Sequence, residues 1–80
     1  MRVILSSDAQ VVLARHPKRQ LLIAKIEQLA DDPASLTNNV KRLVGRRESR
    51  LRVGDIRIIF AFRGDDLVVT AIASRGAVYD

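Results

Sequence analysis

Residues 50–73 read RLRVGDIRIIFAFRGDDLVVTAIA, and this stretch decides the fold class. From residue 50 to residue 62, apolar side chains mostly alternate with arginines, which is the two-residue period of a strand with one buried face. Gly54-Asp55 and residues 64–66 interrupt the pattern and predict two tight turns. Residues 67–73 are apolar on both faces, which favours a central strand. The stretch therefore predicts a meander of antiparallel strands.

The N-terminal part of the chain has a mainly helical pattern. Residues 1–5 are apolar and partly β-branched, which predicts one short strand. A short helix follows and ends near His16, and its candidate N-cap residues are Ser6, Ser7 and Asp8. Pro17 suits the first turn of a second helix, for which His16 is a possible cap.

The second helix is amphipathic over about four turns, because Leu22, Ile26 and Leu29 recur at helical spacing. Asp32-Pro33 ends it, and residues 31–39 read as a loop. The order of elements is therefore β-α-α-β-β-β, which predicts an α+β fold. We expect a small antiparallel sheet packed on one face by a helical hairpin, with residues 1–80 forming a single domain.

The composition excludes several kinds of site. The chain has 80 residues, with 14 lysines and arginines against 9 acids, and its net charge of +5 suggests a polyanionic partner or simple solubility. The absence of cysteine excludes disulfides, thiolate zinc sites and cysteine nucleophiles, and a lone histidine excludes a site that needs two imidazoles. We expect no metal and no cofactor. Without an apolar run of about 18 residues or a signal peptide, we expect a cytoplasmic protein with no membrane contact.

Arginines gather on the face of the predicted sheet that the helices leave uncovered. Arg57 and Arg63 project there, and Arg50 and Arg52 alternate in phase with them if the turn at Gly54-Asp55 keeps the register. Guanidinium groups match phosphate oxygens, so such a cluster can bind several phosphates. Each arginine can also be a solvated strand residue.

Three runs of the sequence carry a family resemblance: VKRLVG at 40–45, SRLRVGDIRIIF at 49–60 and ASRGAVY at 73–79. They resemble the RelE/ParE superfamily of toxins from bacterial type II toxin–antitoxin pairs, and the N-terminal half fits as well. The resemblance implies a RelE/ParE-like fold and a cognate antitoxin that covers the toxin. One branch of the superfamily consists of ribosome-dependent mRNA interferases, and the other poisons DNA gyrase.

The resemblance to the nuclease branch implies three catalytic residues. Arg57 would contact the scissile phosphate, Arg75 would stabilise the transition state, and Tyr79 would stack on a base or assist proton transfer. There are structural alternatives for all three. Arg57 could pair with Asp55 or the chain end, Arg75 could anchor the terminal carboxylate, and Tyr79 could simply pack on the edge of the core. Glu48 and Arg50 stand where one nuclease branch has two lysines. Arg50 keeps the charge but is a poor proton donor, and the carboxylate of Glu48 is a possible general base.

Seven further cations are expected to bind RNA: Lys41, Arg42, Arg46, Arg47, Arg50, Arg52 and Arg63. The resemblance thus implies a metal-independent endoribonuclease that cuts mRNA on the ribosome, inhibits translation and arrests growth until an antitoxin neutralises it. Operator DNA would be reached only through the antitoxin complex. The alternatives are a gyrase inhibitor and a non-catalytic homologue, and the unusual Glu48 and Ser49 favour the latter.

Overall fold

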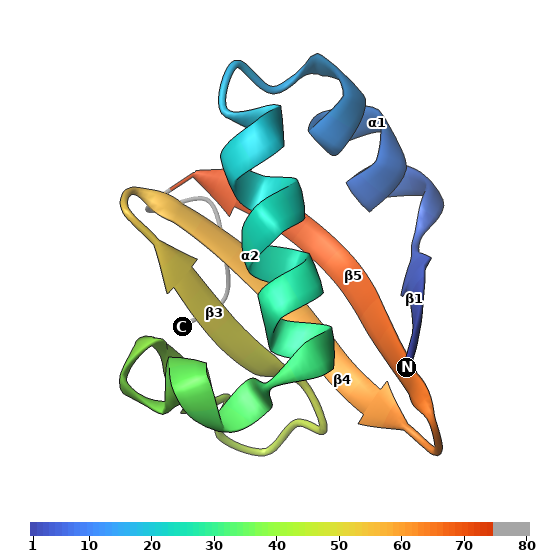
Figure 1. Ribbon diagram of the computed structural model, residues 1–80, viewed down its shortest axis with the longest axis vertical. Coiled ribbons are helices and arrows are strands. Elements are labelled where there is room, and N and C mark those ends of the chain that lie inside the picture. The colour runs from blue at the N-terminus through green and yellow to red at the C-terminus, as the bar shows by residue number, and fades with distance from the viewer. Residues whose placement is uncertain (75–80) are drawn as a thin grey trace.

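The computed structural model describes residues 1–74. In this part of the chain, two α-helices and a short 3₁₀ helix lie over one face of a five-stranded sheet (Figure 1). The elements in chain order are β1 (Arg2–Leu5), α1 (Ser7–Arg15), α2 (Arg19–Asp31), η1 (Pro33–Asn39), β2 (Val40–Arg42), β3 (Ser49–Val53), β4 (Ile56–Arg63) and β5 (Asp66–Ser74). The predicted α+β class and the helical hairpin on one face are confirmed.

The sheet has the strand order β1-β5-β4-β3-β2, and it differs from the prediction in two respects. First, the sheet is mixed rather than antiparallel, because β1 pairs with β5 in parallel. No hairpin turn joins these two strands, so no local pattern sets their relative direction. Second, β2 is an additional strand of three residues, which is too short for its alternation to be recognised in the sequence.

The meander from β3 to β5 follows the prediction. Val53 pairs with Ile56 across the first turn, and Arg63 pairs with Asp66 across the second. Gly54 has a φ of 59°, a left-handed conformation that glycine adopts without steric cost, so it permits the first turn. Strand β5 lies between β1 and β4, which confirms the prediction that the strand with apolar residues on both faces is a central strand.

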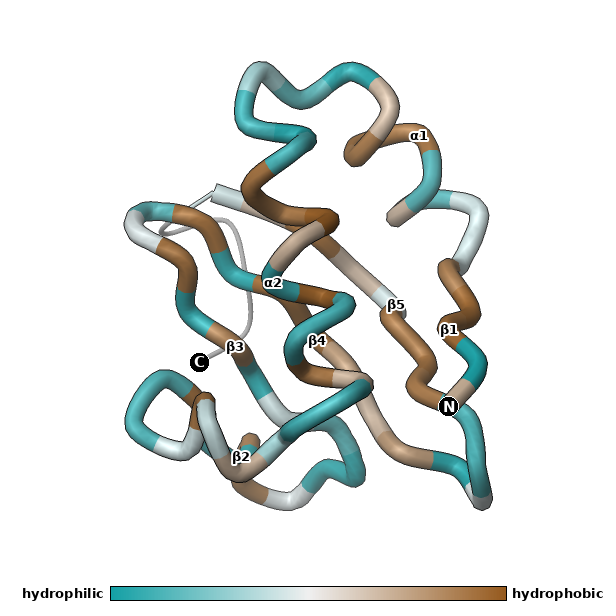
Figure 2. Tube along the Cα trace, viewed as in Figure 1, coloured by the Kyte–Doolittle hydropathy of each residue, from teal (hydrophilic) through white to brown (hydrophobic). Residues whose placement is uncertain are grey.

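The core lies between the helices and the sheet, and helix α1 is fixed at its start by a cap. Ser6 Oγ accepts a hydrogen bond from the Ala9 backbone N–H at 3.1 Å, which satisfies one of the free amides of the first turn. In α2, the predicted stripe of Leu22, Ile26 and Leu29 is buried. Figure 2 shows hydrophobic segments of α2 and of the strands behind it, which together form this core.

The connections around α2 differ in detail from the expectation. Helix α2 begins at Arg19, two residues after Pro17, and His16 Nδ1 accepts a hydrogen bond from the Lys18 N–H at 3.0 Å in the preceding turn. The loop predicted at residues 31–39 is wrong for its larger part, because residues 33–39 form η1 and bury Leu36 in the core. No helix in residues 1–74 is long and apolar enough to cross a membrane.

Candidate nucleic-acid interface

Four cations gather on the sheet face opposite the helices, and we call them the basic face: Lys41, Arg50, Arg52 and Arg57. The strand register brings them together, since Lys41 pairs with Arg50 and Arg52 pairs with Arg57. Side chains directly across a strand pair lie about 4.5–5.5 Å apart at Cβ. Their strand neighbours, such as Leu51 and Ile58, point into the helix-covered core, so these four point away from it. The turn therefore keeps the arginines in phase, as predicted.

Arg57 is the buried member of the basic face, with only 9% of its surface exposed. Its Nη1 donates to the Gly54 carbonyl at 3.3 Å, and its Nε is buried with no hydrogen-bond partner. Within the described residues, no ion pair joins Arg57 to Asp55. Burying a guanidinium without an acidic partner costs free energy, so this position suits an external anion that completes its hydrogen bonds.

Arg63 shares the face of Arg57 but not its location. Six residues of extended strand separate the two, which places their Cα atoms about 20 Å apart. In the strand register, Arg63 lies opposite Asp66. The Asp66 carboxylate accepts two hydrogen bonds from Arg2, at 2.9 and 3.2 Å. The hydrogen bond from Arg2 lowers the pKa of Asp66 below its ordinary value. This end of the sheet is therefore a separate, charge-balanced region.

The loop between β2 and β3 is stabilised by hydrogen bonds and an ion pair within the loop. The Leu43 N–H donates to the Glu48 carbonyl at 3.1 Å, and Gly45 has a φ of 70°. Arg46 Nε donates a hydrogen bond to Glu48 Oε1 at 2.9 Å, and Arg46 Nη2 lies 2.8 Å from the same oxygen in an ion pair. The candidate general base is thus engaged in an ion pair that holds the loop, and its catalytic role stays a prediction.

Two other predicted site residues, Arg75 and Tyr79, lie outside the described residues. Their roles stay predictions. Among residues 1–74, no three His, Asp or Glu side chains gather in a way that could hold a metal ion.

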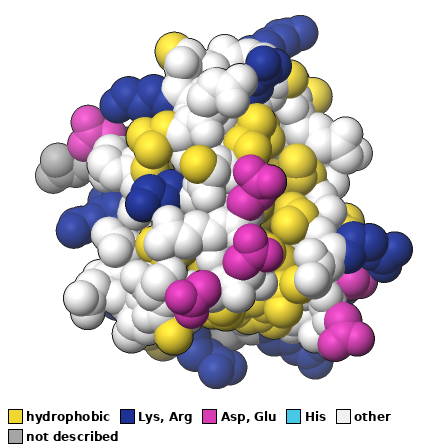
Figure 3. Space-filling view, in the orientation of Figure 1, with side chains coloured by type: hydrophobic (Ala, Val, Ile, Leu, Met, Phe, Trp, Pro, Cys, Tyr) yellow, Lys and Arg dark blue, Asp and Glu magenta, His cyan; other side chains and the backbone are white. Residues whose placement is uncertain are grey.

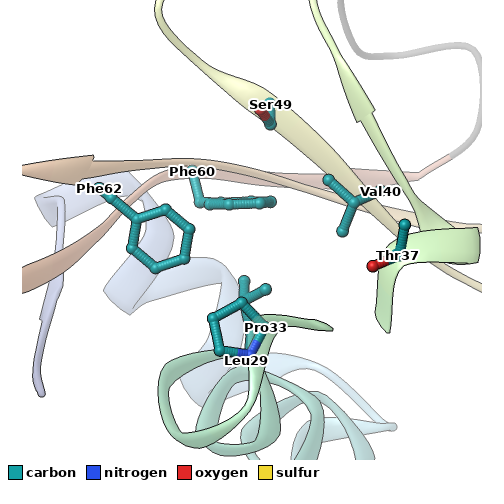
Figure 4. A pocket seen from close by; sticks show the side chains of 7 residues that line it. All are labelled: Leu29, Pro33, Thr37, Val40, Ser49, Phe60 and Phe62. Carbon is teal, nitrogen blue, oxygen red and sulfur yellow. The ribbon is translucent and has the colours of Figure 1, made fainter. Parts of the chain in front are cut away.

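The helix-covered side of the molecule exposes hydrophobic side chains (Figure 3), and it has two apolar depressions. One, of about 180 Å³, lies between the end of α2, η1 and β4 and is lined in part by Leu29, Phe60 and Phe62 (Figure 4). The two phenylalanine rings meet nearly edge to face at 5.6 Å, and Phe62 stays 44% exposed. The other, of about 320 Å³, lies between β1, α1 and α2 and is lined by Val3, Leu5, Leu13, Ile23, Ile26 and Glu27.

A comparison with models of known protein families identifies one family. The family described as "ParE toxin of type II toxin-antitoxin system, parDE" matches residues 3–79. The chain belongs to this toxin family. No curated protein sequence matches the toxin.

Solved structures match the fold of the toxin over nearly its whole length. A chain of the archaeal RelE–RelB complex from Pyrococcus horikoshii is 21% identical, with a TM-score of 0.76 over 96% of the toxin and 97% of that chain. A chain of the intact E. coli RelBE toxin–antitoxin complex is 12% identical, with a TM-score of 0.73 over 96% and 98%. A chain of the RelB–RelE complex from Methanococcus jannaschii is 19% identical, with a TM-score of 0.71 over 89% and 88%. At these identities, the likeness shows that the toxin shares their fold.

Sequence reasoning missed three features of the toxin's surface. The apolar depressions were not found, because helical spacing for Leu29 and strand alternation for Phe62 mark both residues as buried, although Phe62 is 44% exposed. The burial of Arg57 was not found either. Arg52 and Arg57 both alternate with apolar residues, yet Arg52 is exposed and Arg57 is buried, so the alternation does not distinguish them. The third feature is Val44, at the tip of the β2–β3 loop, which is 95% exposed. Its position in the sequence between Arg42 and Arg46 could have indicated this exposure.

Proposed function

We propose that this toxin is a ribosome-dependent mRNA interferase that a cognate antitoxin neutralises. The observation that carries the proposal is the basic face, in which the buried and under-partnered Arg57 lies opposite Arg52 on a rigid pair of strands. Like charges directly across two strands destabilise a sheet, so this arrangement suits a site that is completed by an anion. A phosphodiester of RNA supplies that anion.

The reaction needs charge neutralisation more than it needs a metal. The 2′-oxygen of a nucleotide loses its proton, attacks the adjacent phosphorus and forms a 2′,3′-cyclic phosphate. The bond from phosphorus to the 5′-oxygen breaks, and that oxygen takes up a proton. Arg57 stabilises the additional negative charge on the five-coordinate phosphorus, and electrostatic stabilisation of this kind is commonly the largest catalytic contribution. Lys41, Arg50 and Arg52 hold the neighbouring phosphates.

Proton transfer is assigned to residues near the C-terminus. On this proposal, Arg75 adds a second guanidinium at the phosphate and Tyr79 assists proton transfer or stacks on a base. Neighbouring arginines favour the phenolate form of a tyrosine, which is the form that can accept a proton. Glu48 is the alternative base, although its ion pair with Arg46 has to loosen for a carboxylate oxygen to reach the 2′-hydroxyl.

The ribosome is needed because the basic face offers little to hold single-stranded RNA in place. Binding of single strands relies on bases stacking on aromatic side chains. Within residues 1–74 the aromatic residues are Phe60 and Phe62, and both lie at the apolar depression on the opposite side of the sheet. The ribosome therefore supplies the mRNA in a fixed geometry, and the toxin supplies charge.

The antitoxin partner fits the helix-covered side of the toxin. The two apolar depressions flank α2, and a chain that fills them removes apolar surface from water. Glu27, Asp31 and Asp32 are exposed on or beside α2, so the segment that covers them carries basic side chains. An acidic segment of the same antitoxin opposes the basic face and blocks phosphate binding.

The test is a reconstituted translation reaction in which mRNA 5′ ends are mapped by primer extension, with and without ribosomes. We expect new ends at the ribosomal A site only when ribosomes are present. Arg57→Ala and Tyr79→Phe should abolish these ends and keep antitoxin binding, whereas the exposed control Arg19→Ala should cut like the wild type. Cutting that survives both active-site changes would show that the nuclease site is wrongly placed.

Inhibition of DNA gyrase is the second candidate, because the matching family is described as ParE toxins. This activity does not need Arg57 and Tyr79 to act on one phosphate. Intact mRNA together with loss of DNA supercoiling by purified gyrase would establish it. Intact mRNA with neither effect, and with antitoxin binding retained, would identify a non-catalytic homologue.

A further inference from the structure

The loop between β2 and β3 ends in a tip, residues 42–47, that combines cations with one exposed apolar side chain. Val44 is 95% exposed, more than any other large hydrophobic residue of the described chain. Arg42, Arg46 and Arg47 surround it in sequence, and together with Val44 they line a shallow depression at the tip. An apolar side chain among cations matches a nucleic-acid surface, which offers both phosphates and apolar edges of bases and sugars.

The tip is built to hold Val44 outward. Leu43, its neighbour, is only 4% exposed and anchors the loop. The Arg46 N–H donates to the Leu43 carbonyl at 3.3 Å, which closes a turn around Val44 and Gly45. The ion pair between Arg46 and Glu48 braces the turn from one side. A preformed tip loses little conformational entropy when it binds.

The tip is continuous in charge with the basic face. Residues 40–57 hold seven of the fourteen lysines and arginines of the chain but only two of its nine acids, Glu48 and Asp55. Of these acids, Glu48 is already paired with Arg46. Strand β2 carries Lys41 on the basic face and Arg42 at the start of the tip. One polyanion can therefore span both.

We propose that residues 42–47 dock in the minor groove of a folded RNA helix. Val44 lies against riboses and base edges, while Arg42 and Arg47 bind phosphates on the two strands. The minor groove of an RNA helix is wide and shallow and exposes sugars, so it admits the tip of a two-stranded ribbon. A single valine is too little apolar surface to hold a protein on a membrane, which argues for RNA over lipid.

This inference rests on the proposed function, because the ribosome is the folded RNA that the toxin meets. Binding is measured by co-sedimentation with purified bacterial ribosomes. We expect Val44→Ser to weaken binding by about tenfold, the factor that corresponds to burial of one valine side chain. Val44→Ile should bind like the wild type. Val11→Ser is the matched control, since Val11 is 52% exposed on α1 and should tolerate the change.

Electrostatics gives a second readout. Arg47→Ala should lower the slope of log affinity against log salt concentration by about one, which is the loss of one phosphate contact. The location is mapped by a hydroxyl-radical probe attached at Val44→Cys, because the chain contains no cysteine of its own. We expect cuts on both strands of one ribosomal RNA helix, and no such cuts from the same probe at Val11→Cys.

The outcomes separate the two proposals. Wild-type ribosome binding that Val44→Ser leaves unchanged overturns the docking inference and leaves the interferase proposal standing. Binding that depends on Val44, with mRNA left intact, supports docking and overturns the interferase proposal. Absence of ribosome binding by the wild type overturns both, and Val44-dependent binding to anionic phosphatidylglycerol vesicles in that case identifies the tip as a lipid contact.

Discussion

Replacing Arg57 by methionine should stabilise the toxin while it removes the proposed activity. Methionine retains a long, unbranched apolar side chain and removes the guanidinium. A buried polar group without a partner costs about 1–3 kcal/mol, and Arg57 Nε is such a group. Relief of the repulsion from Arg52, directly across the strands, adds about 0.2–1 kcal/mol.

One favourable contact is lost in the same variant. The hydrogen bond from Arg57 Nη1 to the Gly54 carbonyl is long, at 3.3 Å, and an ordinary hydrogen bond contributes about 0.5–1.5 kcal/mol. The net expectation is a gain of about 1–2 kcal/mol in the free energy of unfolding. In a domain of 80 residues, each kcal/mol raises the melting temperature by about 4–8 °C.

The assay is urea unfolding followed by circular dichroism, with Arg52→Met as the matched variant. Arg52 belongs to the same cross-strand pair but is exposed, so its replacement should gain only the relief of repulsion, about 0.2–1 kcal/mol. A loss of more than about 1 kcal/mol in Arg57→Met, or an equal gain in both variants, would refute the reasoning that burial makes Arg57 costly.

Three further predictions concern stability. Ser6→Ala removes the cap on the Ala9 N–H and should cost about 1 kcal/mol in urea unfolding, and an unchanged free energy of unfolding would contradict the role of this cap. Gly54→Ala forces a left-handed conformation on a residue with a side chain and should cost about 1–2 kcal/mol, although no atom lies within 4 Å of the new methyl. Arg2 lowers the pKa of Asp66, so this ion pair stabilises the fold above the unfolded-state pKa and loses its effect as pH falls through the lower folded-state value. Asp66→Asn should therefore be less stable than the wild type at pH 7 and equal to it in strong acid, and a difference that persists in acid would contradict this.

The features that could be predicted from the sequence are those that depend on near neighbours in the chain. The turn at Gly54-Asp55 follows from a glycine between two alternating runs, and this turn alone determines that Arg52 lies opposite Arg57. The buried stripe of α2 follows from the spacing of Leu22 and Ile26.

The features that could not be predicted depend on contacts between distant segments. The parallel direction of β1 follows from its packing beside β5, about sixty residues later in the chain. The seven residues of η1 contain proline, serine and asparagine and read as a loop, yet Leu36 anchors them in the core. The depth at which Arg57 is buried also depends on its surroundings in three dimensions, because alternation assigns a face and not an exposure. The separation of Arg63 from Arg57 was available from the sequence, since six residues of strand span about 20 Å.

The arrangement of charge sets different requirements for the two proposed partners. In the two proposals above, RNA meets the basic face and the tip at residues 42–47, so its affinity should rest mainly on phosphate contacts and fall steeply with salt. In the proposed arrangement, a neutralising antitoxin also covers the apolar depressions around α2, where basic side chains would match the exposed acids Asp31 and Glu27. Apolar burial does not weaken with salt as charge contacts do. On these proposals, the antitoxin should outcompete RNA most clearly at high ionic strength. Its affinity should then depend mainly on the helix-covered side, although the basic face is the surface that it has to block.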